Sequence, residues 1–411
     1  MNTNKKTPKL RFKGFTDDWE QRKLGDVAII TGGGTPSTNV PEYWNGDIDW
    51  YSPVEIGKNR YVSKSTRKIT KLGLEKSSAK LLPIGTVLFT SRAGIGNTAI
   101  LQAEGCTNQG FQSITPDSKE LDTYFLYTMT PRLKRYGEVT GAGSTFVEVS
   151  GKQMEKMSLV LPSLEEQKQI GRFFRTIDDS ITLHQRKLEK LKLNKSALLQ
   201  KLFPQKGCTI PDVRFKGFTD AWEQRKLSQI TVRVTRKNGN QSDLPLTISA
   251  QDGLVDQRKY FNRQVASRDM TNYYLIKKGE FAYNKSYSEG YPFGAVKRLD
   301  YYDIGALSTL YILFEITDKN ISSDFLVSYY MTHLWYKEVS KRAAEGARNH
   351  GLLNISTEDF FNSELNIPNS IEEQVKIGNL IKQFDKFITL HQRKLDCLIS
   401  IKKGLLQQLF V

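Results

Sequence analysis

The sequence predicts an α+β protein in which two β-rich α/β domains are joined by two long helices that form an antiparallel coiled coil. Two repeats carry this prediction, and they give the chain a pseudo-two-fold, tandem-duplicated plan. Residues 181–188 and 388–395 both read ITLHQRKL, and each copy lies midway along a long pattern of helical apolar residues. Residues 11–24 and 214–227 match at thirteen of fourteen positions. The blocks between the repeats share little sequence, but in both of them turn residues separate short β-like runs.

The repeats divide the chain into five segments. We expect a first domain over 1–164, with an opening segment at 9–24, and a first long helix over 165–203. A linker over 204–213 follows, because Pro204 cannot continue a helix. We expect a second domain over 214–371, with its opening segment at 214–227, and a second long helix over 372–411. Each domain should also contain one shorter helix, near 122–137 and near 323–342.

Apolar residues recur along both long helices at alternating spacings of three and four. In each copy eight of the ten positions are apolar, and the two exceptions, a His and a Lys, fall at equivalent places. The positions are Ile170, Phe174, Ile177, Ile181, His184, Leu188, Leu191, Lys195, Leu198 and Leu202, then Ile377, Ile381, Phe384, Ile388, His391, Leu395, Leu398, Lys402, Leu405 and Leu409. A narrow seam over about four heptads predicts a coiled coil, for which the second copy can supply the partner. The alternative is two amphipathic helices that dock on separate cores.

The composition favours a polyanionic partner. A net charge of +16 and a pI near 9.5 suit DNA, RNA or an anionic membrane surface, although a basic surface can also serve solubility alone. The three cysteines form no CxxC pair and the four histidines show no metal-binding spacing, so we expect neither a disulfide framework nor a metal site. We see no signal peptide or membrane-spanning run, which predicts a cytoplasmic protein without membrane contact.

An ordered set of local motifs resembles the specificity (S) subunit of type I restriction–modification systems, the HsdS family, over nearly the whole chain. In the first block the motifs are TGGGTPST at 31–38, PEYWNGDIDW at 41–50, LLPIGTVLFTSRAGIG at 81–96 and TNQGF at 107–111. In the second block they are KKGEFAYNKSYSEGYPFG at 277–294 and GARNHGLLNIS at 346–356, which look like another type of recognition domain. Both blocks end in a proline followed by Glu-Glu-Gln. Each motif is weak alone, whereas the ordered set is specific.

The resemblance implies a non-catalytic DNA specificity subunit. Each domain would be a target recognition domain that reads one half of an asymmetric bipartite site in double-stranded DNA, and the helix pair would set the gap and dock the methyltransferase. The partners would be two methyltransferase (M) subunits and, in the full complex, two restriction (R) subunits. S-adenosylmethionine for adenine-N6 methylation, ATP and magnesium would be used by these partners, and this chain would hold no cofactor. The alternatives are a stand-alone sequence-specific DNA-binding regulator, or an enzyme, whose Asn/Asp-Pro-Pro-aromatic or GxxxxGK[ST] motif is not found in the sequence.

Candidate DNA-binding residues are polar, basic or aromatic side chains on expected loops, where they could reach base edges or phosphates. They are Thr35, Ser37, Tyr43, Arg92, Asn108 and Gln109 in the first domain, and Lys259, Arg263, Tyr283, Asn284, Lys285, Tyr287, Arg348, Asn349 and His350 in the second. Arg92 could instead form a surface ion pair, Asn108 and Gln109 could cap a turn, and Lys259 and Arg263 could merely solvate a face. Because clustered polar residues are costly to bury, we expect the second-domain loops to be exposed.

Candidate partner-binding residues are those that both repeats share. Since they are the same in two otherwise different blocks, they cannot encode a difference between half-sites, and should either dock the methyltransferase or pack on the helices. They are Trp19, Glu165, Glu166, Gln167, Trp222, Glu372, Glu373 and Gln374. The acidic residues could also stabilise the helix N-termini through the helix dipole.

Overall fold

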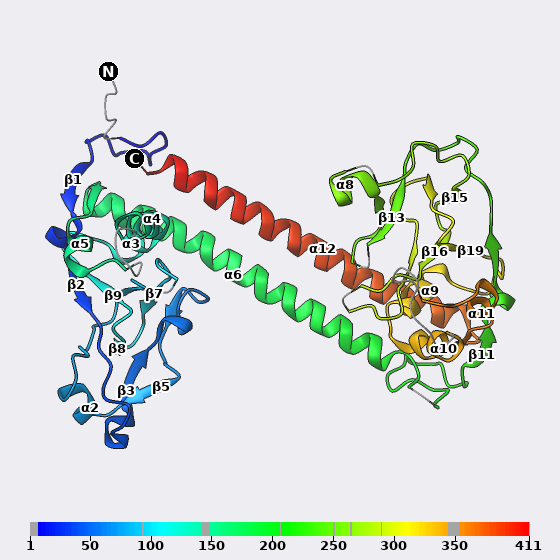
Figure 1. Cartoon of the computed structure of the whole chain (residues 1–411), viewed down its shortest axis with the longest axis horizontal. Helices are drawn as coiled ribbons and strands as arrows, with labels where there is room; N and C mark the ends of the chain where they lie inside the picture. Colours follow the sequence, from blue (N-terminus) through cyan, green and yellow to red (C-terminus); the bar gives the residue numbers. More distant parts are fainter. Residues whose placement is uncertain are drawn as a thin grey trace. The chain divides into compact units, whose positions relative to one another are not determined.

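The computed structural model describes residues 7–92, 94–141, 148–205, 207–249, 251–263, 265–288, 290–343 and 353–410. The chain folds into two compact units. The first unit is formed by Met1–Gln185 together with Arg393–Val411, and the second by Arg186–Gln392. Each unit therefore contains one β-rich domain and part of each long helix (Figure 1).

The first domain is built around a mixed five-stranded sheet. Its strand order is β2 (Ala28–Gly32), β9 (Gln112–Pro116), β6 (Val87–Phe89), β7 (Thr98–Leu101) and β4 (Tyr61–Val62). A second sheet has the order β5 (Arg67–Ile69), β3 (Trp44–Tyr51) and β8 (Gly105–Thr107), and β1 (Glu20–Lys23) pairs with β10 (Ser158–Leu161). The helices are α1 (Leu24–Val27), α2 (Lys71–Glu75), α3 (Thr123–Thr128), α4 (Thr130–Gly141) and α5 (Gly151–Glu155), with 3-10 turns η1 (Pro41–Tyr43) and η2 (Pro53–Glu55).

The second domain repeats part of this plan. Its largest sheet has the order β12 (Thr231–Val234), β19 (Ile312–Ile316), β16 (Phe281–Asn284) and β17 (Ala295–Arg298). Three further antiparallel pairs are β11 (Glu223–Lys226) with β20 (Glu364–Ile367), β13 (Leu246–Ser249) with β14 (Gly253–Asp256), and β15 (Tyr274–Lys277) with β18 (Ile304–Leu307). The helices are α7 (Leu227–Ile230), α8 (Gln257–Phe261), α9 (Ser323–Tyr330), α10 (Leu334–Arg342) and α11 (Thr357–Phe361). The helix expected near 122–137 and the one near 323–342 are each a consecutive pair, α3–α4 and α9–α10. The expectation of one shorter helix per domain is wrong, because α1, α2 and α5 in the first domain and α7, α8 and α11 in the second are further short helices.

The two long helices are α6 (Leu164–Lys201) and α12 (Ile371–Gln408), each of 38 residues. Their first and last residues are related by the same offset of 207 as the repeated ITLHQRKL. Within each unit they lie antiparallel, so that the start of one helix accompanies the end of the other. This arrangement confirms the predicted fold class.

The C-terminal end of each long helix completes the core of the domain from the other repeat. In the first unit Phe410, two residues beyond the end of α12, packs 5.3 Å from Phe125 and 6.2 Å from Trp19 between ring centroids. In the second unit Phe203, two residues beyond the end of α6, packs 5.5 Å from Phe325 and 5.8 Å from Trp222. Leu409 and Leu202 are buried beside them. The long helices therefore pair with each other, as predicted, and they also dock on the domain cores, which was the alternative.

Two glycines allow each long helix to cross a shorter one closely. A Cβ atom on Gly171 of α6 would lie 2.6 Å from Asp122 Oδ1, at the start of α3. A Cβ atom on Gly378 of α12 would lie 2.8 Å from the Asp324 carbonyl carbon and from Phe325 N, at the start of α9. Because the two glycines are also related by the 207-residue offset, the duplication preserves this packing.

Candidate nucleic-acid interface

Four loops meet at one end of the strands in the first domain's main sheet. Gly34 N donates to Thr107 O at 2.8 Å, Ser91 N to Gly110 O at 2.8 Å, and Val149 N to Ser91 O at 3.1 Å. These loops follow β2 and β6, precede β9 and precede α5, which places them at the same end of antiparallel strands. We call residues 33–37, 91–92, 107–110 and 148–150 the first loop edge.

Most of the predicted first-domain residues lie on the first loop edge. Thr35 Oγ1 donates to Gln109 Oε1, and Gln109 itself is exposed. Asn108 Oδ1 accepts from Gly110 N at 2.8 Å, which is the turn-capping role foreseen for it. Arg92 pairs with Glu148 at 2.9 Å while 47% of its side chain stays exposed, so the surface ion pair also forms.

The other two first-domain candidates are Ser37, the last residue of the 33–37 loop, and Tyr43, which lies outside the first loop edge. Ser37 is exposed, and its carbonyl oxygen accepts from Trp44 Nε1 at 3.1 Å. Tyr43 is half-buried and packs against the small core that contains Trp44. The glycine run is held close to the neighbouring loop, because a Cβ atom on Gly33 would collide with the backbone carbonyl of Asn108. The structure therefore brings Thr35, Asn108 and Gln109 together on a loop edge with a defined backbone.

The second domain has an equivalent loop after β16. Leu353 N donates to Lys285 O at 3.0 Å, as Val149 N does to Ser91 O in the first domain. Lys285 Nζ donates to Ile355 O at 3.3 Å, and Asn284 Oδ1 accepts from Ser286 N at 3.0 Å. Tyr287 is 57% exposed. We call residues 284–288 the second loop edge.

The expected exposure of Tyr283 is wrong. Its ring is fully buried, stacks on Phe360 with centroids 4.5 Å apart, and its hydroxyl donates to Phe293 O at 2.8 Å. Burial raises the pKa of this hydroxyl. Tyr283 lies on the core side of β16, where an aromatic ring is favoured over a polar one. Its neighbours along the chain, from Asn284 onward, leave the core.

The basic candidates of the second domain are exposed. Lys259 lies on α8 and Arg263 follows that helix, both at the surface. Their neighbour Arg258 pairs with Asp256 at 3.1 Å. Arg348, Asn349 and His350 lie outside the described residues.

The shared residues at the starts of the long helices hold each unit together. Glu166 accepts from Arg11 Nε and Nη2, both at 2.8 Å, and Glu373 accepts from Arg214 at 2.7 and 2.8 Å. Both carboxylates are buried, and these hydrogen bonds raise the pKa of each arginine. Charge-assisted bidentate bonds of this kind join the opening segment to the helix with a fixed geometry.

Buried glutamines and tryptophans complete these junctions. Gln167 accepts from Asp122 N at 3.0 Å and donates to Pro162 O at 3.0 Å, and Gln374 makes the equivalent bonds with Ser322 and Pro368 at 2.9 Å each. Trp19 and Trp222 are 1% and 3% exposed. These contacts show that the buried shared residues pack on the helices, which was the alternative to docking the methyltransferase. Glu165 and Glu372 are exposed in the first helical turns, where partner docking remains a prediction.

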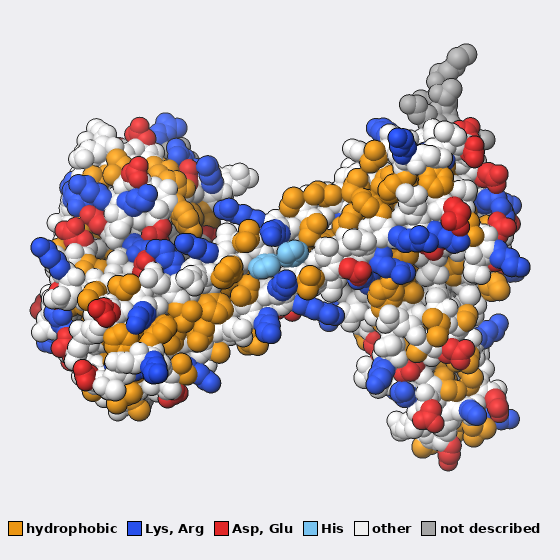
Figure 2. Space-filling model, turned by 180° about the vertical axis from the view of Figure 1, so that it is seen from behind, with side chains coloured by type: hydrophobic (Ala, Val, Ile, Leu, Met, Phe, Trp, Pro, Cys, Tyr) orange, Lys and Arg blue, Asp and Glu red, His pale blue; other side chains and the backbone are white. Residues whose placement is uncertain are grey.

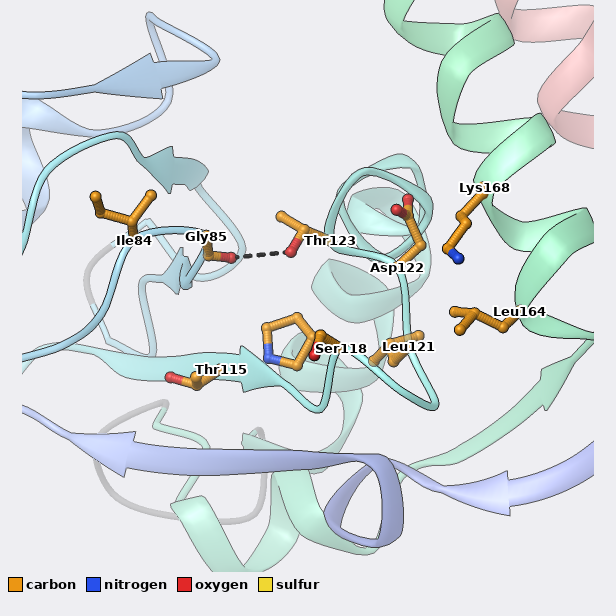
Figure 3. A pocket seen from close by; sticks show the side chains of 10 residues that line it. Ile84, Gly85, Thr115, Ser118, Leu121, Asp122, Thr123, Leu164 and Lys168 are labelled. Atoms are coloured by element: carbon orange, nitrogen blue, oxygen red, sulfur yellow. Dashed lines mark hydrogen bonds between the residues drawn. The ribbon is translucent and has the colours of Figure 1, made fainter.

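A shallow hollow lies elsewhere on the first unit, between α3 and the start of α6 (Figure 3). Its volume is about 290 Å³, and Asp122, Thr123 and Lys168 are among its lining residues. The polar groups serve the fold, because Asp122 Oδ1 caps α3 by accepting from Phe125 N at 2.8 Å and Thr123 Oγ1 donates to Gly85 O at 3.2 Å. Over the described residues, no group of His, Cys, Asp or Glu side chains could hold a metal ion. The loop edges are the stronger candidates for a functional surface.

A family model described as the type I restriction modification DNA specificity domain matches residues 16–193 and 257–398. The chain belongs to this family. It is 33% identical over 236 residues to the type I restriction enzyme MjaIX specificity subunit of Methanocaldococcus jannaschii, covering 55% of each chain. It is 29% identical over 184 residues to the EcoR124I/EcoR124II specificity subunit of Escherichia coli, covering 42% of this chain and 44% of that one. The matches thus span about half the length of these curated relatives.

Specificity subunits also provide the structural likeness. A crystal structure of the type I restriction–modification S subunit from M. genitalium matches with a TM-score of 0.61 at 14% identity, covering 98% of this chain and 99% of that chain. At this level of identity the likeness concerns the fold. No helix within the described ranges is long and apolar enough to cross a bilayer.

Proposed function

We propose that this chain is the non-catalytic DNA specificity subunit of a type I restriction–modification complex, in which each domain reads one half of an asymmetric bipartite target. One observation carries the proposal: the framework is repeated, whereas the loops that it presents differ. Equivalent helix ends, glycine crossings and Arg–Glu pairs support both domains. The loop after β6 reads SRAGIG and the loop after β16 reads KSYSEG. A common framework with unlike loops suits a protein that reads two different sequences.

The loop edges carry suitable chemistry for reading bases. Asn and Gln amides can bond bidentately to adenine, and Arg or Lys can bond to guanine. In the first domain these groups are Asn108, Gln109 and Arg92, and in the second they are Asn284 and Lys285. Lys259 and Arg263, which are exposed, would contact phosphates, and such contacts fix the register of a protein on DNA. The net charge of +16 favours the approach of DNA, and Figure 2 shows Lys and Arg side chains spread over the visible face of each unit.

The helix pair has two further tasks in this proposal. It sets the gap between the half-sites and, with the exposed acids at the helix starts, docks two methyltransferase subunits. Two restriction subunits join in the full complex, which works on DNA in the cytoplasm. S-adenosylmethionine, ATP and magnesium are used by those subunits, while this chain chooses the sequence.

Genome-wide adenine methylation tests the function directly. The chain is co-expressed with its cognate methyltransferase subunit in a host without restriction systems, and methylated adenines are mapped. We expect one asymmetric bipartite motif that disappears when this chain is omitted. A motif that persists without the chain contradicts the proposal. Tight binding to a promoter-like site without the methyltransferase, and no change in methylation, would instead indicate a stand-alone regulator.

A further inference from the structure

The lysine in each helical seam forms an ion pair with the opposite helix. In the second unit Lys195 Nζ of α6 lies 2.6 Å from Asp385 Oδ1 of α12. In the first unit Lys402 Nζ of α12 lies 2.6 Å from Asp178 Oδ1 of α6. The offset of 207 residues relates the two lysines and also the two aspartates. The same contact therefore occurs once in each unit, with the roles of the helices exchanged.

Both pairs are partly buried. The side chains of Lys195 and Asp385 are 16% and 41% exposed, and those of Lys402 and Asp178 are 27% and 10% exposed. Asp178 Oδ2 also accepts from the Tyr124 hydroxyl of α3 at 2.8 Å, so its pair is tied to the first domain. In the second unit burial lowers the pKa of Lys297 on β17, and the charge of Lys195 acts in the same direction. The Lys402–Asp178 pair thus lies where both helices meet the first domain.

The pairs distinguish the observed register from neighbouring ones. If one helix moved by a heptad, apolar seam residues would still meet apolar residues, and the hydrophobic seam alone would discriminate weakly. The lysines and aspartates would lose each other. In either shifted register each lysine would face a glycine or a glutamine, namely Gly378 or Gln392 for Lys195 and Gly171 or Gln185 for Lys402. Each aspartate would face a leucine, namely Leu188 or Leu202 for Asp385 and Leu395 or Leu409 for Asp178. One slip would separate all four charges from these partners, and the cost should be greatest for Asp178 and Lys195, whose side chains are only 10% and 16% exposed.

We propose that the Lys195–Asp385 and Lys402–Asp178 pairs fix the register of the helix pair and thereby select the length of the gap in the DNA target. The second half of this inference rests on the proposed function, in which the helices set the gap. One heptad corresponds to about 10 Å of helix, or about three base pairs of B-DNA. Phe203 and Phe410, eight residues beyond each lysine, are buried in the domain cores, and their packing also favours the observed register. These four charged residues are positioning residues, since they act through the helices.

The register is measured on the full chain alone. Spin labels are placed at Lys192→Cys of α6 and Lys386→Cys of α12, two exposed positions of the second unit, with Cys208→Ser and Cys397→Ser removing the exposed native thiols. We expect Lys195→Asp, which puts two carboxylates together, to shift or broaden the distance distribution. The exchanged pair Lys195→Asp with Asp385→Lys should restore it. The control Lys190→Asp makes the same charge change at an exposed position of α6 and should leave it unchanged.

Two results would overturn the register role: an unaltered distribution in Lys195→Asp, or failure of the exchanged pair to recover it. If Lys195→Asp does not fold, the exchanged pair carries the test. The exchanged pair restores the attraction between the two helices with the charges reversed, so it should fold with the parental distance. If Lys195 were needed only for its shape, an aspartate at this position would not restore that distance.

Methylation mapping then tests the gap. With the methyltransferase subunit present, we expect Lys195→Asp to lower the ratio of methylation at the parental gap to methylation at other gaps by about tenfold or more, as the loss of a partly buried pair implies. The exchanged pair should restore the ratio. A shifted spin-label distance with an unchanged gap contradicts the selection of the gap. If the parent chain directs no methylation, the proposed function fails, while the spin-label result still judges the register.

Discussion

Gln109 shows how one residue can combine a fixed position with an accessible amide. Its Oε1 atom accepts from Thr35, and its side chain is exposed on the first loop edge. We predict that Gln109→Leu changes the first half-site alone, because a misread base pair costs about 1–3 kcal/mol when a bidentate contact is lost. Methylation mapping measures this change.

Gln102 provides the matched control for this substitution. It is exposed and follows β7, so it lies at the opposite end of the strands of the same sheet. Gln102→Leu should leave both half-sites unchanged. Equal effects of the two substitutions, or a change in the second half-site, would argue against base reading by the first loop edge.

Gly378 is a residue where one methyl group should matter. A Cβ atom there would lie 2.8 Å from backbone atoms of α9, whereas a Cβ atom on Gly404 of the same helix meets nothing within 4 Å. We predict that Gly378→Ala lowers the free energy of unfolding by about 1–3 kcal/mol through overpacking. Gly404→Ala should raise it by up to about 1 kcal/mol through helix propensity. Denaturant unfolding compares the two, and a stabilised Gly378→Ala protein would show that the helices can move apart.

Sequence reasoning at the residue scale identified types of residue better than their surroundings. Thr35 and Gln109 could be selected because turn residues flank them, and the structure brings them together. Tyr283 and Trp19 could not be separated from exposed aromatics, because exposure depends on which strand face or helix end meets the core. Lys195 was visible in the sequence as a polar exception within the apolar seam. Its partner Asp385 could not be identified, because it lies outside the seam positions.

The ends of the long helices are the elements on which each domain depends. Phe410 is 8% exposed and Phe203 is fully buried, each among aromatic rings of the domain from the other repeat. We predict that Phe410→Ala destabilises the first unit by about 3–5 kcal/mol, and that Phe203→Ala does so in the second unit. Hydrogen exchange of β6 and of β16 reports on the two units separately. A loss of protection in both units from either substitution would contradict independent cores.

The helices were the most predictable elements. Their seams indicated both of them, and α6 ends two residues before the expected Phe203. Turn residues separate short β-like runs in both blocks, and β6, β7 and β16 are strands that such runs form. Which helix end completes which core could not be predicted, because the repeats make the two seams nearly equivalent and either docking would bury a similar apolar surface.

At the scale of the whole molecule, we predict that the length of the helix pair determines the gap. Removing 187–193 and 394–400 together deletes one heptad from each helix at equivalent places and leaves Lys195, Asp385, Lys402 and Asp178 in the chain. The gap should shorten by about three base pairs, because each helix loses about 10 Å, while both half-sites persist. Methylation mapping gives both quantities. Altered half-sites with an unchanged gap would show that the helices do not measure the DNA.

The duplicated plan and the basic charge could be predicted from the sequence, and the resemblance added the DNA target. The bases that each domain reads could not, because base recognition depends on a few loop atoms whose placement the repeats do not constrain. Thr35, Asn108 and Gln109 illustrate this, since their backbone positions depend on contacts among loops that are distant in sequence.

The crossed docking of the helix ends also orders events on the ribosome. Leu405, Leu406, Leu409 and Phe410 pack in the core of the first unit, yet they are synthesised after the whole of the second unit. The second domain can therefore close its core first, when α12 begins to emerge, while the first domain waits for the last turns of that helix with Trp19 and Phe125 uncovered. Since exposed apolar surface invites aggregation during synthesis, the N-terminal domain is the part of a nascent chain that most needs chaperone protection.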